Sequence, residues 1–248
     1  MCLVIVAWKT IPDTRLRCVG NRDEFYTRPT QALHQWQNGI VAGQDLVAKG
    51  TWMGIHATGR FAVVTNFRDG STGSKAAQQS RGKLISDFLL SKQTPAEYAS
   101  TLVNTATQYD GYNLLFSDLD TLYHFSNVQG DPLPLEPGHY AVSNHLLDTP
   151  WPKVIAAKER LAAVDFRETE SLEIMRDEAR PPGPLPSTGI DPELEVALSP
   201  IFVRADSYGT RASSWVSIGE DSRGVVYEKN FDKTGGLTGE TRLEIHLT

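Results

Sequence analysis

Cys2 has the most distinctive chemistry in this chain, because it directly follows the initiator residue Met1. A Cys side chain is small enough for Met1 to be removed, which leaves one residue with both a thiol and a free α-amine. An α-amine has a pKa of roughly 7.7–8.0 and a thiol of about 8.5, so near neutral pH the amine can take the proton of the thiol. We therefore interpret Cys2 as a candidate nucleophile that carries its own general base.

Cys2 also has a plain structural explanation, because most free cysteines behave as small buried hydrophobic residues. A lone Cys becomes a candidate nucleophile only when its partner groups can be named. Two apolar runs, residues 2–8 and 16–20, predict a hairpin whose second strand continues into Asn21-Arg22-Asp23-Glu24. In that hairpin the carboxylate of Asp23 can hold the ammonium form of Cys2, and amide N–H groups nearby can stabilise an oxyanion.

Several further polar residues end predicted strands, where a rigid sheet can aim side chains into a cleft. They are Asp23, Asn66, Asn144 and Arg211. Each has an ordinary alternative, since Asn is frequent in turns and surface Asp and Arg pair with one another. Taken singly, each of these positions is better explained by such a structural role than by a function.

Composition limits the classes of partner that we expect. The 248 residues carry a net charge of -6 and contain no Lys/Arg run, which disfavours nucleic acid and lipid headgroups as ligands. Two cysteines are too few for a disulfide framework, and the start of the chain does not resemble a signal peptide. No apolar stretch approaches the ~20 residues of a spanning helix. We expect a cytoplasmic protein with a small-molecule substrate or ligand, no nucleic acid and no membrane span; its oligomeric state stays open.

Motifs for metals and cofactors are absent from the sequence. The six His residues are scattered, no Gly-rich loop fits a nucleotide fingerprint, and there is no Cys-x-x-Cys-His run. We therefore predict no metal and no cofactor. Trp52, Trp151 and Trp215 are interpreted as core residues or pocket walls.

Strand patterns at both ends of the chain enclose helix patterns in the middle. We predict hairpins at 51–56 with 60–66 and at 112–116 with 121–125, and strands at 39–42, 139–144, 201–203, 211–219, 224–230 and 241–247. Helices are predicted from Ser80 as the cap to residue 90, from Pro95 to 107, from 150 to 163 and from 168 to 179, with residues 31–50 otherwise irregular. This order predicts an α+β fold of two antiparallel sheets with helices outside, in a single domain spanning residues 1–248.

The chain resembles the NRDE family, the group that includes the transport and Golgi organisation protein of animals. The resemblance rests on Met1-Cys2, on Asn21-Arg22-Asp23-Glu24-Phe25-Tyr26-Thr27-Arg28-Pro29, on residues 50–55, on Thr65-Asn66, Ser143-Asn144, residues 149–153 and Tyr208-Gly209-Thr210-Arg211. These motifs occur in the family's order over nearly the whole chain.

That family is itself similar to the amino-terminal-nucleophile (Ntn) hydrolases, notably bile-salt and penicillin V amidases with Cys at the processed terminus. The resemblance implies a four-layer αββα fold with Cys2 as nucleophile and Asp23 positioning its amine. It further implies that Asn66 and Asn144 lie near the oxyanion and the α-amine, and that Arg211 corresponds to an arginine of a late strand.

One position departs from the amidase pattern. Those amidases carry Arg three residues before the Asp, where this chain has Gly20, while Arg22 stands next to Asp23 instead. We expect Arg22, with Trp52, to contact the substrate. Arg22 and Arg211 together suggest a substrate that bears a carboxylate or another acidic group.

The leading functional hypothesis is an amidohydrolase that cleaves a C–N amide bond through Cys2 after loss of Met1. The resemblance implies a second hypothesis from another class, in which the same cleft carries haem or an acyl-CoA/lipid for trafficking, without turnover. In that case the thiol of Cys2 or a nearby His would be the haem ligand. A scaffold without any ligand is the third option.

Overall fold

Two antiparallel β-sheets form the centre of the protein in the computed structural model, which describes residues 2–70 and 79–248. One sheet has the strand order β10-β1-β2-β11-β12-β13. Its strands are β1 (Cys2–Ile11), β2 (Thr14–Phe25), β10 (Gly138–Val142), β11 (Tyr208–Gly219), β12 (Arg223–Phe231) and β13 (Leu237–His246). The predicted hairpin of the first two strands is confirmed, with Cys2 opposite Arg22.

The second sheet runs in sequence order from β3 to β9. Its strands are β3 (Thr30–Gln35), β4 (Ile40–Asp45), β5 (Met53–His56), β6 (Arg60–Asn66), β7 (Tyr112–Ser117), β8 (Leu122–Ser126) and β9 (Leu133–Leu135). Both predicted hairpins, β5 with β6 and β7 with β8, are confirmed.

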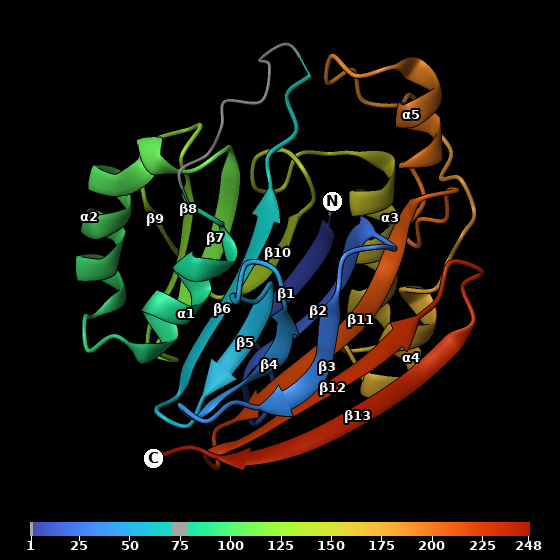
Figure 1. Cartoon of the computed structure of the whole chain (residues 1–248). Coiled ribbons are helices and arrows are strands. Elements are labelled where there is room, and N and C mark those ends of the chain that lie inside the picture. Colours follow the sequence, from blue (N-terminus) through green and yellow to red (C-terminus); the bar gives the residue numbers. More distant parts are fainter. Residues whose placement is uncertain (1, 71–78) are drawn as a thin grey trace.

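Helices cover the outer faces of the two sheets, as Figure 1 shows with α1 and α2 on one side and α3 and α4 on the other. The helices are α1 (Gly82–Leu90), α2 (Pro95–Thr105), a 3-10 turn (Ala106–Gln108), α3 (Pro152–Ala163), α4 (Glu168–Ile174) and α5 (Pro192–Ala197). The α+β class and the αββα layering are therefore confirmed. No helix within the described residues is both long and apolar enough to span a membrane.

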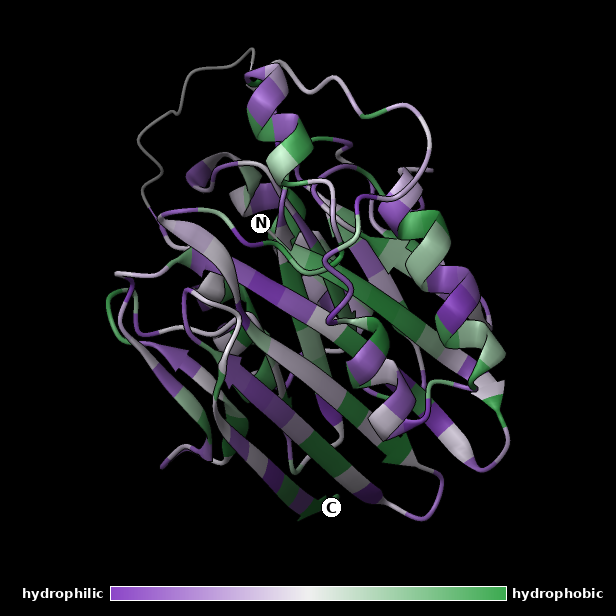
Figure 2. Ribbon diagram, turned by 90° about the vertical axis from the view of Figure 1, so that its right-hand side faces the viewer, coloured by the Kyte–Doolittle hydropathy of each residue, from purple (hydrophilic) through white to green (hydrophobic). Residues whose placement is uncertain are grey.

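Strand β1 shows how the sequence builds these layers, since successive side chains of a strand point to opposite faces. Leu3 and Ile5 pack with helix α3, whereas Val4 and Val6 pack against the second sheet. Both faces are buried, which explains the continuous apolar run. In β13, at the sheet edge, hydrophilic and hydrophobic residues alternate toward the C-terminus (Figure 2).

Two predicted segments differ from the structure because backbone groups find tertiary partners. Residues 201–203 form no strand: Ile201 O accepts a hydrogen bond from the Asn21 side chain, and the Val203 N–H donates to Thr210 Oγ1. Helix α4 ends at Ile174, well before residue 179, and Phe202 N–H donates to the carbonyl oxygen of Asp177 beyond it.

Other differences concern element ends and short elements. Strand β3 occupies residues predicted to be irregular, and α5 was not predicted. Helix α1 has Arg81 at its N-cap without a side-chain cap bond, so the predicted Ser80 cap is wrong. The Thr94 capping box of α2 is present, as its sequence indicates.

Candidate functional site

A cavity of about 120 Å³ lies where the ends of both sheets meet the start of α1. Its walls include Cys2, Arg22 and Asp23 from the first sheet, Trp52 and Asn66 from the second-sheet region, and Arg81 at the helix start. Besides Cys2 itself, four of the six residues predicted for the chemistry and the substrate contact therefore line the same cavity. Asn144 and Arg211 are not among the residues that line this cavity.

Cys2 lines the cavity and belongs to none of the hydrophobic clusters, whereas Cys18 lies fully buried in the core between the sheets. Burial raises the pKa of the Cys2 thiol. The backbone N–H of Asp23 hydrogen-bonds the sulfur, and this bond and the Arg22 guanidinium both act to lower that pKa. Met1, whose removal frees the α-amine, lies outside the described residues.

Asp23 stands near the end of β2 and is 3% exposed. Its Oδ1 accepts a 2.7 Å hydrogen bond from the Thr210 hydroxyl, which itself accepts the Val203 N–H at 2.9 Å. Burial raises the pKa of the Asp23 carboxyl, while Lys153, the Thr210 hydroxyl and Arg22 act to lower it. The carboxyl is therefore held in one orientation beside Cys2.

Arg22 forms a wall of the cavity and stacks on Trp52, with its guanidinium carbon 4.6 Å from the ring centroid. Its Nη2 lies 3.6 Å from Glu24 and 3.7 Å from Asp45. These partners fix a cation on the face of the first sheet that Cys2 shares, since Cys2 lies opposite Arg22 across β1 and β2.

Gly20, where amidases of the similar class carry Arg, lies in a crowded place. An added Cβ would meet Leu3 O at 3.0 Å and Met53 Cε at 3.1 Å. A longer side chain at this position would therefore require its neighbours to move. The guanidinium next to Cys2 in this chain is that of Arg22.

Asn66 and Asn144 are joined to each other at the edge of the site. The Asn144 amide donates to the backbone oxygen of Asn66 at 3.0 Å, and Asn144 O accepts the Arg68 N–H. Asn66 is half-buried and lines the cavity, whereas Asn144 is completely buried behind it. Only Asn66 is therefore in position to meet a ligand within the cavity; Asn144 holds the end of β6 in place.

Arg211 is turned away from the Cys2 cavity. Its Nη1 donates to three backbone oxygens, those of Phe25, Tyr26 and Arg28, and thereby fixes the turn after β2. It lines a separate cavity of about 300 Å³ that also contacts Arg22. Burial, and then the charge of Arg22, lowers the pKa of this guanidinium.

Three residues near the site were not predicted from the sequence. Thr210 orients Asp23, Lys153 lies buried behind it, and Arg81 lines the cavity from the start of α1. Burial lowers the pKa of Arg81, and its Nη1 donates to Gly111 O. Thr210 and Lys153 do belong to the motifs that carry the family resemblance, which is the one signal that marks them.

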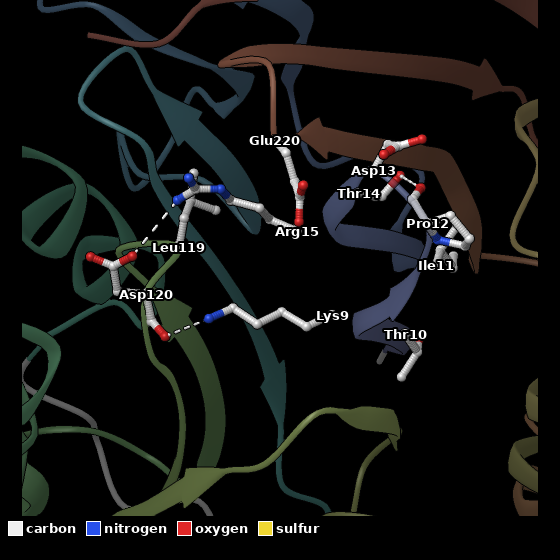
Figure 3. Close-up of a pocket in the computed structure, with 10 residues that line it drawn as sticks. All are labelled: Lys9, Thr10, Ile11, Pro12, Asp13, Thr14, Arg15, Leu119, Asp120 and Glu220. Carbon is white, nitrogen blue, oxygen red and sulfur yellow. Dashed lines mark hydrogen bonds and ion pairs between the residues drawn. The ribbon is translucent and has the colours of Figure 1, made fainter.

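A larger cavity, of about 520 Å³, lies at the loop joining β1 to β2, at the other end of β1 from Cys2. Figure 3 shows Lys9 and Arg15 reaching across it toward Asp120. Lys9 Nζ donates to the Asp120 backbone oxygen, and Arg15 pairs with a carboxylate that is 85% exposed. These cations have partners at a solvated surface, so size alone does not make this cavity a reaction site.

Comparison with known proteins decides the family. The family model described as Transport and Golgi organisation 2 matches residues 1–233. The chain belongs to the Transport and Golgi organisation 2 family. The family's Mus musculus homolog is 30% identical, with 91% of each chain covered, and the Homo sapiens homolog is 29% identical, with 93% of each covered. The family predicted from the sequence is confirmed.

Solved structures show the fold of this Transport and Golgi organisation 2 family member. A mutant conjugated bile acid hydrolase from Clostridium perfringens matches with a TM-score of 0.52 at 9% identity, covering 98% of this chain and 92% of that one. A Caenorhabditis elegans ortholog of N-acylethanolamine-hydrolyzing acid amidase matches with a TM-score of 0.50 at 12% identity, covering 86% and 92%. The chain therefore has the fold of Ntn hydrolases.

Proposed function

We propose that this protein is an N-terminal-nucleophile amidohydrolase that cleaves a C–N amide bond through Cys2 after Met1 is removed. One observation carries the proposal: Cys2 lines a polar cavity, its sulfur is hydrogen-bonded by the Asp23 N–H, and it belongs to none of the hydrophobic clusters of the described residues. A buried structural Cys would resemble Cys18, which is enclosed by the core.

Acylation begins when the α-amine of Cys2 takes the thiol proton. The thiolate attacks the carbonyl carbon of the amide, a C–S bond forms, and an electron pair moves to the oxygen. The side-chain amide of Asn66 and a backbone N–H hold this oxyanion. The C–N bond then breaks as the Cys2 ammonium gives its proton to the leaving nitrogen, which leaves a thioester.

Deacylation uses the same residues in reverse roles. Water adds to the thioester carbonyl while the α-amine of Cys2 takes one of its protons. The C–S bond breaks, the carboxylic acid leaves, and the proton returns to the thiolate. The carboxylate of Asp23 holds the α-ammonium between these steps, in the orientation that its hydrogen bond with Thr210 maintains.

The charges around the cavity support a substrate with an anionic group. Arg22, Arg28 and Arg81 all line it. Asp45 holds Arg28 at 2.9 Å, whereas the carboxylates nearest Arg22 lie 3.6 and 3.7 Å away. We therefore assign the more loosely paired Arg22, together with Arg81, to the substrate. The walls come from both sheets, which supports treating residues 1–248 as one functional domain.

The cavity does not fit the carrier alternative. Its volume of about 120 Å³ is below the roughly 300–1,000 Å³ typical of sites for ligands of cofactor size. No His is among the described residues that line it. We therefore assign no haem or acyl-CoA binding to this site.

The test uses intact-mass spectrometry of purified protein that has lost Met1. The protein is incubated with a library of amides bearing a carboxylate, beside Cys2→Ala and the matched control Cys18→Ala. We expect a Cys2-dependent acyl adduct that Cys18→Ala retains and Cys2→Ala lacks. The proposal would be overturned if neither the unchanged protein nor Cys18→Ala formed an adduct, or if both of these and Cys2→Ala formed it equally.

A further inference from the structure

Lys153 is a lysine in the first turn of α3, yet it is only 3% exposed. Its Nζ donates a 2.9 Å hydrogen bond to the backbone oxygen of Leu198. Lysine is almost never fully buried unless it is paired, because removing its charge from water is costly. Helix α3 covers the outer face of the first sheet, so this ammonium group lies behind the strands that carry Cys2 and Asp23.

Charged and titratable groups face Lys153 from four parts of the fold. They are Cys2 on β1, Asp23 on β2, Arg68 just after β6 and Glu195 on α5. Together the two carboxylates and the two cations are electrically balanced, before the thiol and α-amine of Cys2 are counted.

Glu195 is already engaged by other groups. Its Oε2 lies 3.2 Å from Arg68 Nη2, and its Oε1 accepts hydrogen bonds from the N–H and hydroxyl of Thr188. Arg68 in turn stacks on Trp151, with its guanidinium carbon 5.0 Å from the ring centroid. The charge that remains opposite Lys153 is therefore the carboxylate of Asp23.

We propose that Lys153 is a positioning residue for the Cys2 site, a fixed positive charge that balances Asp23 and favours the thiolate form of Cys2. Its role in turnover rests on the amidohydrolase function proposed above, but its effect on the thiol does not. When Lys153 balances Asp23, a proton that the α-amine takes from solvent adds a net positive charge to the cluster. A proton that the α-amine takes from the thiol creates one positive and one negative charge, so the cluster stays neutral.

The proton affinity of Lys153 agrees with this geometry. Burial lowers the pKa of its ammonium group to about 8, while the charges of Asp23 and Cys2 act to raise it. At pH 7 the group is therefore still mostly protonated. Since electrostatic coupling is mutual, a thiolate that stabilises the Lys153 ammonium is stabilised by it in return.

The experiment measures the pH dependence of iodoacetamide alkylation at Cys2, in protein that has lost Met1. Lys153→Gln keeps a donor for the Leu198 oxygen but removes the charge, and Lys153→Arg keeps the charge. Lys158→Gln, on the same helix and paired with Asp148, is the matched control. We expect Lys153→Gln to shift the profile to higher pH and to slow alkylation at pH 7 about tenfold, as one unit of thiol pKa would.

For Lys153→Arg and Lys158→Gln we expect an alkylation rate at pH 7 within about twofold of that of the unchanged protein, since each variant preserves the charge balance at the site. A Lys153→Gln profile identical to that of the unchanged protein would overturn the inference and leave a structural role. If Lys153→Gln does not fold, Lys153→Met takes its place. If neither folds, a folded Lys153→Arg that shifts the profile more than twofold contradicts the inference, and one that does not supports it.

Alkylation requires no turnover, so this result is separable from the fate of the amidohydrolase proposal. A shifted Lys153→Gln profile without any acyl adduct would support the charge role of Lys153 and contradict the amidohydrolase proposal. An acyl adduct with an unshifted profile does the opposite.

Discussion

The hydroxyl of Thr210 donates a 2.7 Å hydrogen bond to Oδ1 of Asp23. The direction of this bond is fixed, because the same oxygen accepts the Val203 N–H at 2.9 Å and its own proton is left for the carboxylate. Both residues are buried, so the bond sets the orientation of the group that would hold the Cys2 amine.

Replacing Thr210 by Val removes this donor at nearly constant volume. We expect Thr210→Val to slow acyl-adduct formation at Cys2 at least about tenfold, since a hydrogen bond to a charged group contributes about 1.5–3 kcal/mol. Thr210→Ser keeps the hydroxyl and is the control, expected within about threefold of the unchanged protein. Equal rates for Val and Ser would show that the bond does not position Asp23.

His124 on β8 is predicted to make the fold sensitive to acid. Burial lowers the pKa of its imidazole from 6.5 to about 4, and its Nε2 lies 3.4 Å from Asn113 Oδ1. Between pH 6.5 and 4 the unfolded state binds the extra proton, so the free energy of unfolding falls as the pH falls through this window.

The measurement for His124 is urea unfolding at pH 7 and pH 4.5. Between pH 7 and pH 4.5 we expect the free energy of unfolding to fall by roughly 2–3 kcal/mol less in His124→Gln than in the unchanged protein. Each unit of pKa shift corresponds to about 1.4 kcal/mol. The same loss in both proteins would remove His124 from the acid response.

Glu228 is a buried carboxyl between the sheets, bonded by Leu33 N–H, Ser214 and Asn230. Burial raises its pKa, so the folded state binds the extra proton above pH 4.5 and stability falls as the pH rises through the folded-state pKa. Glu228→Gln removes the charge that must be buried at high pH.

We expect Glu228→Gln to raise the free energy of unfolding at pH 8 by about 1 kcal/mol or more, and to gain nothing at pH 4. Urea midpoints at the two pH values check this. A variant equally destabilised at both would mean that the carboxylate's hydrogen bonds outweigh the cost of burying its charge.

The two cysteines are predicted to differ in reactivity. Cys18 is completely enclosed by the core and burial raises its pKa, whereas Cys2 lines a cavity. Iodoacetamide should modify Cys2 alone in the folded protein and both residues in urea. Peptide mapping after a timed reaction measures this, and equal modification in the folded state would contradict the position assigned to Cys2.

The sequence was sufficient to place Cys2 beside the Asn-Arg-Asp-Glu run, because two apolar runs of adequate length on either side of a short turn favour one antiparallel pairing. The structure has that pairing, with Cys2 opposite Arg22. The two-sheet fold was predictable for the same reason, since strand patterns are local.

Arg211 illustrates what local patterns miss. A register shift between Thr210 and Ala212 leaves Arg211 without a partner residue across from it on β2. Its guanidinium is bonded to the turn after that strand. Such a bulge depends on both strands and leaves no mark in the sequence of either one.

The burial of Lys153 depends on tertiary contacts that its local sequence does not indicate. A lysine at the start of an amphipathic helix is ordinarily solvated, and its burial here depends on Leu198, 45 residues later in the chain. Residues 201–203 have a strand pattern but form no strand, because the Ile201 backbone oxygen accepts a hydrogen bond from the buried Asn21 side chain. No sequence period marks that role.

The state of the chain terminus tests the central claim most directly. Intact-mass analysis of protein purified from its own cells measures whether Met1 is present. We predict a mass lacking Met1, with Cys2 carrying a free α-amine that reacts as a 1,2-aminothiol with an aldehyde probe. A chain that retains Met1, or whose Cys2 amine is acylated throughout the population, would contradict the amidohydrolase account.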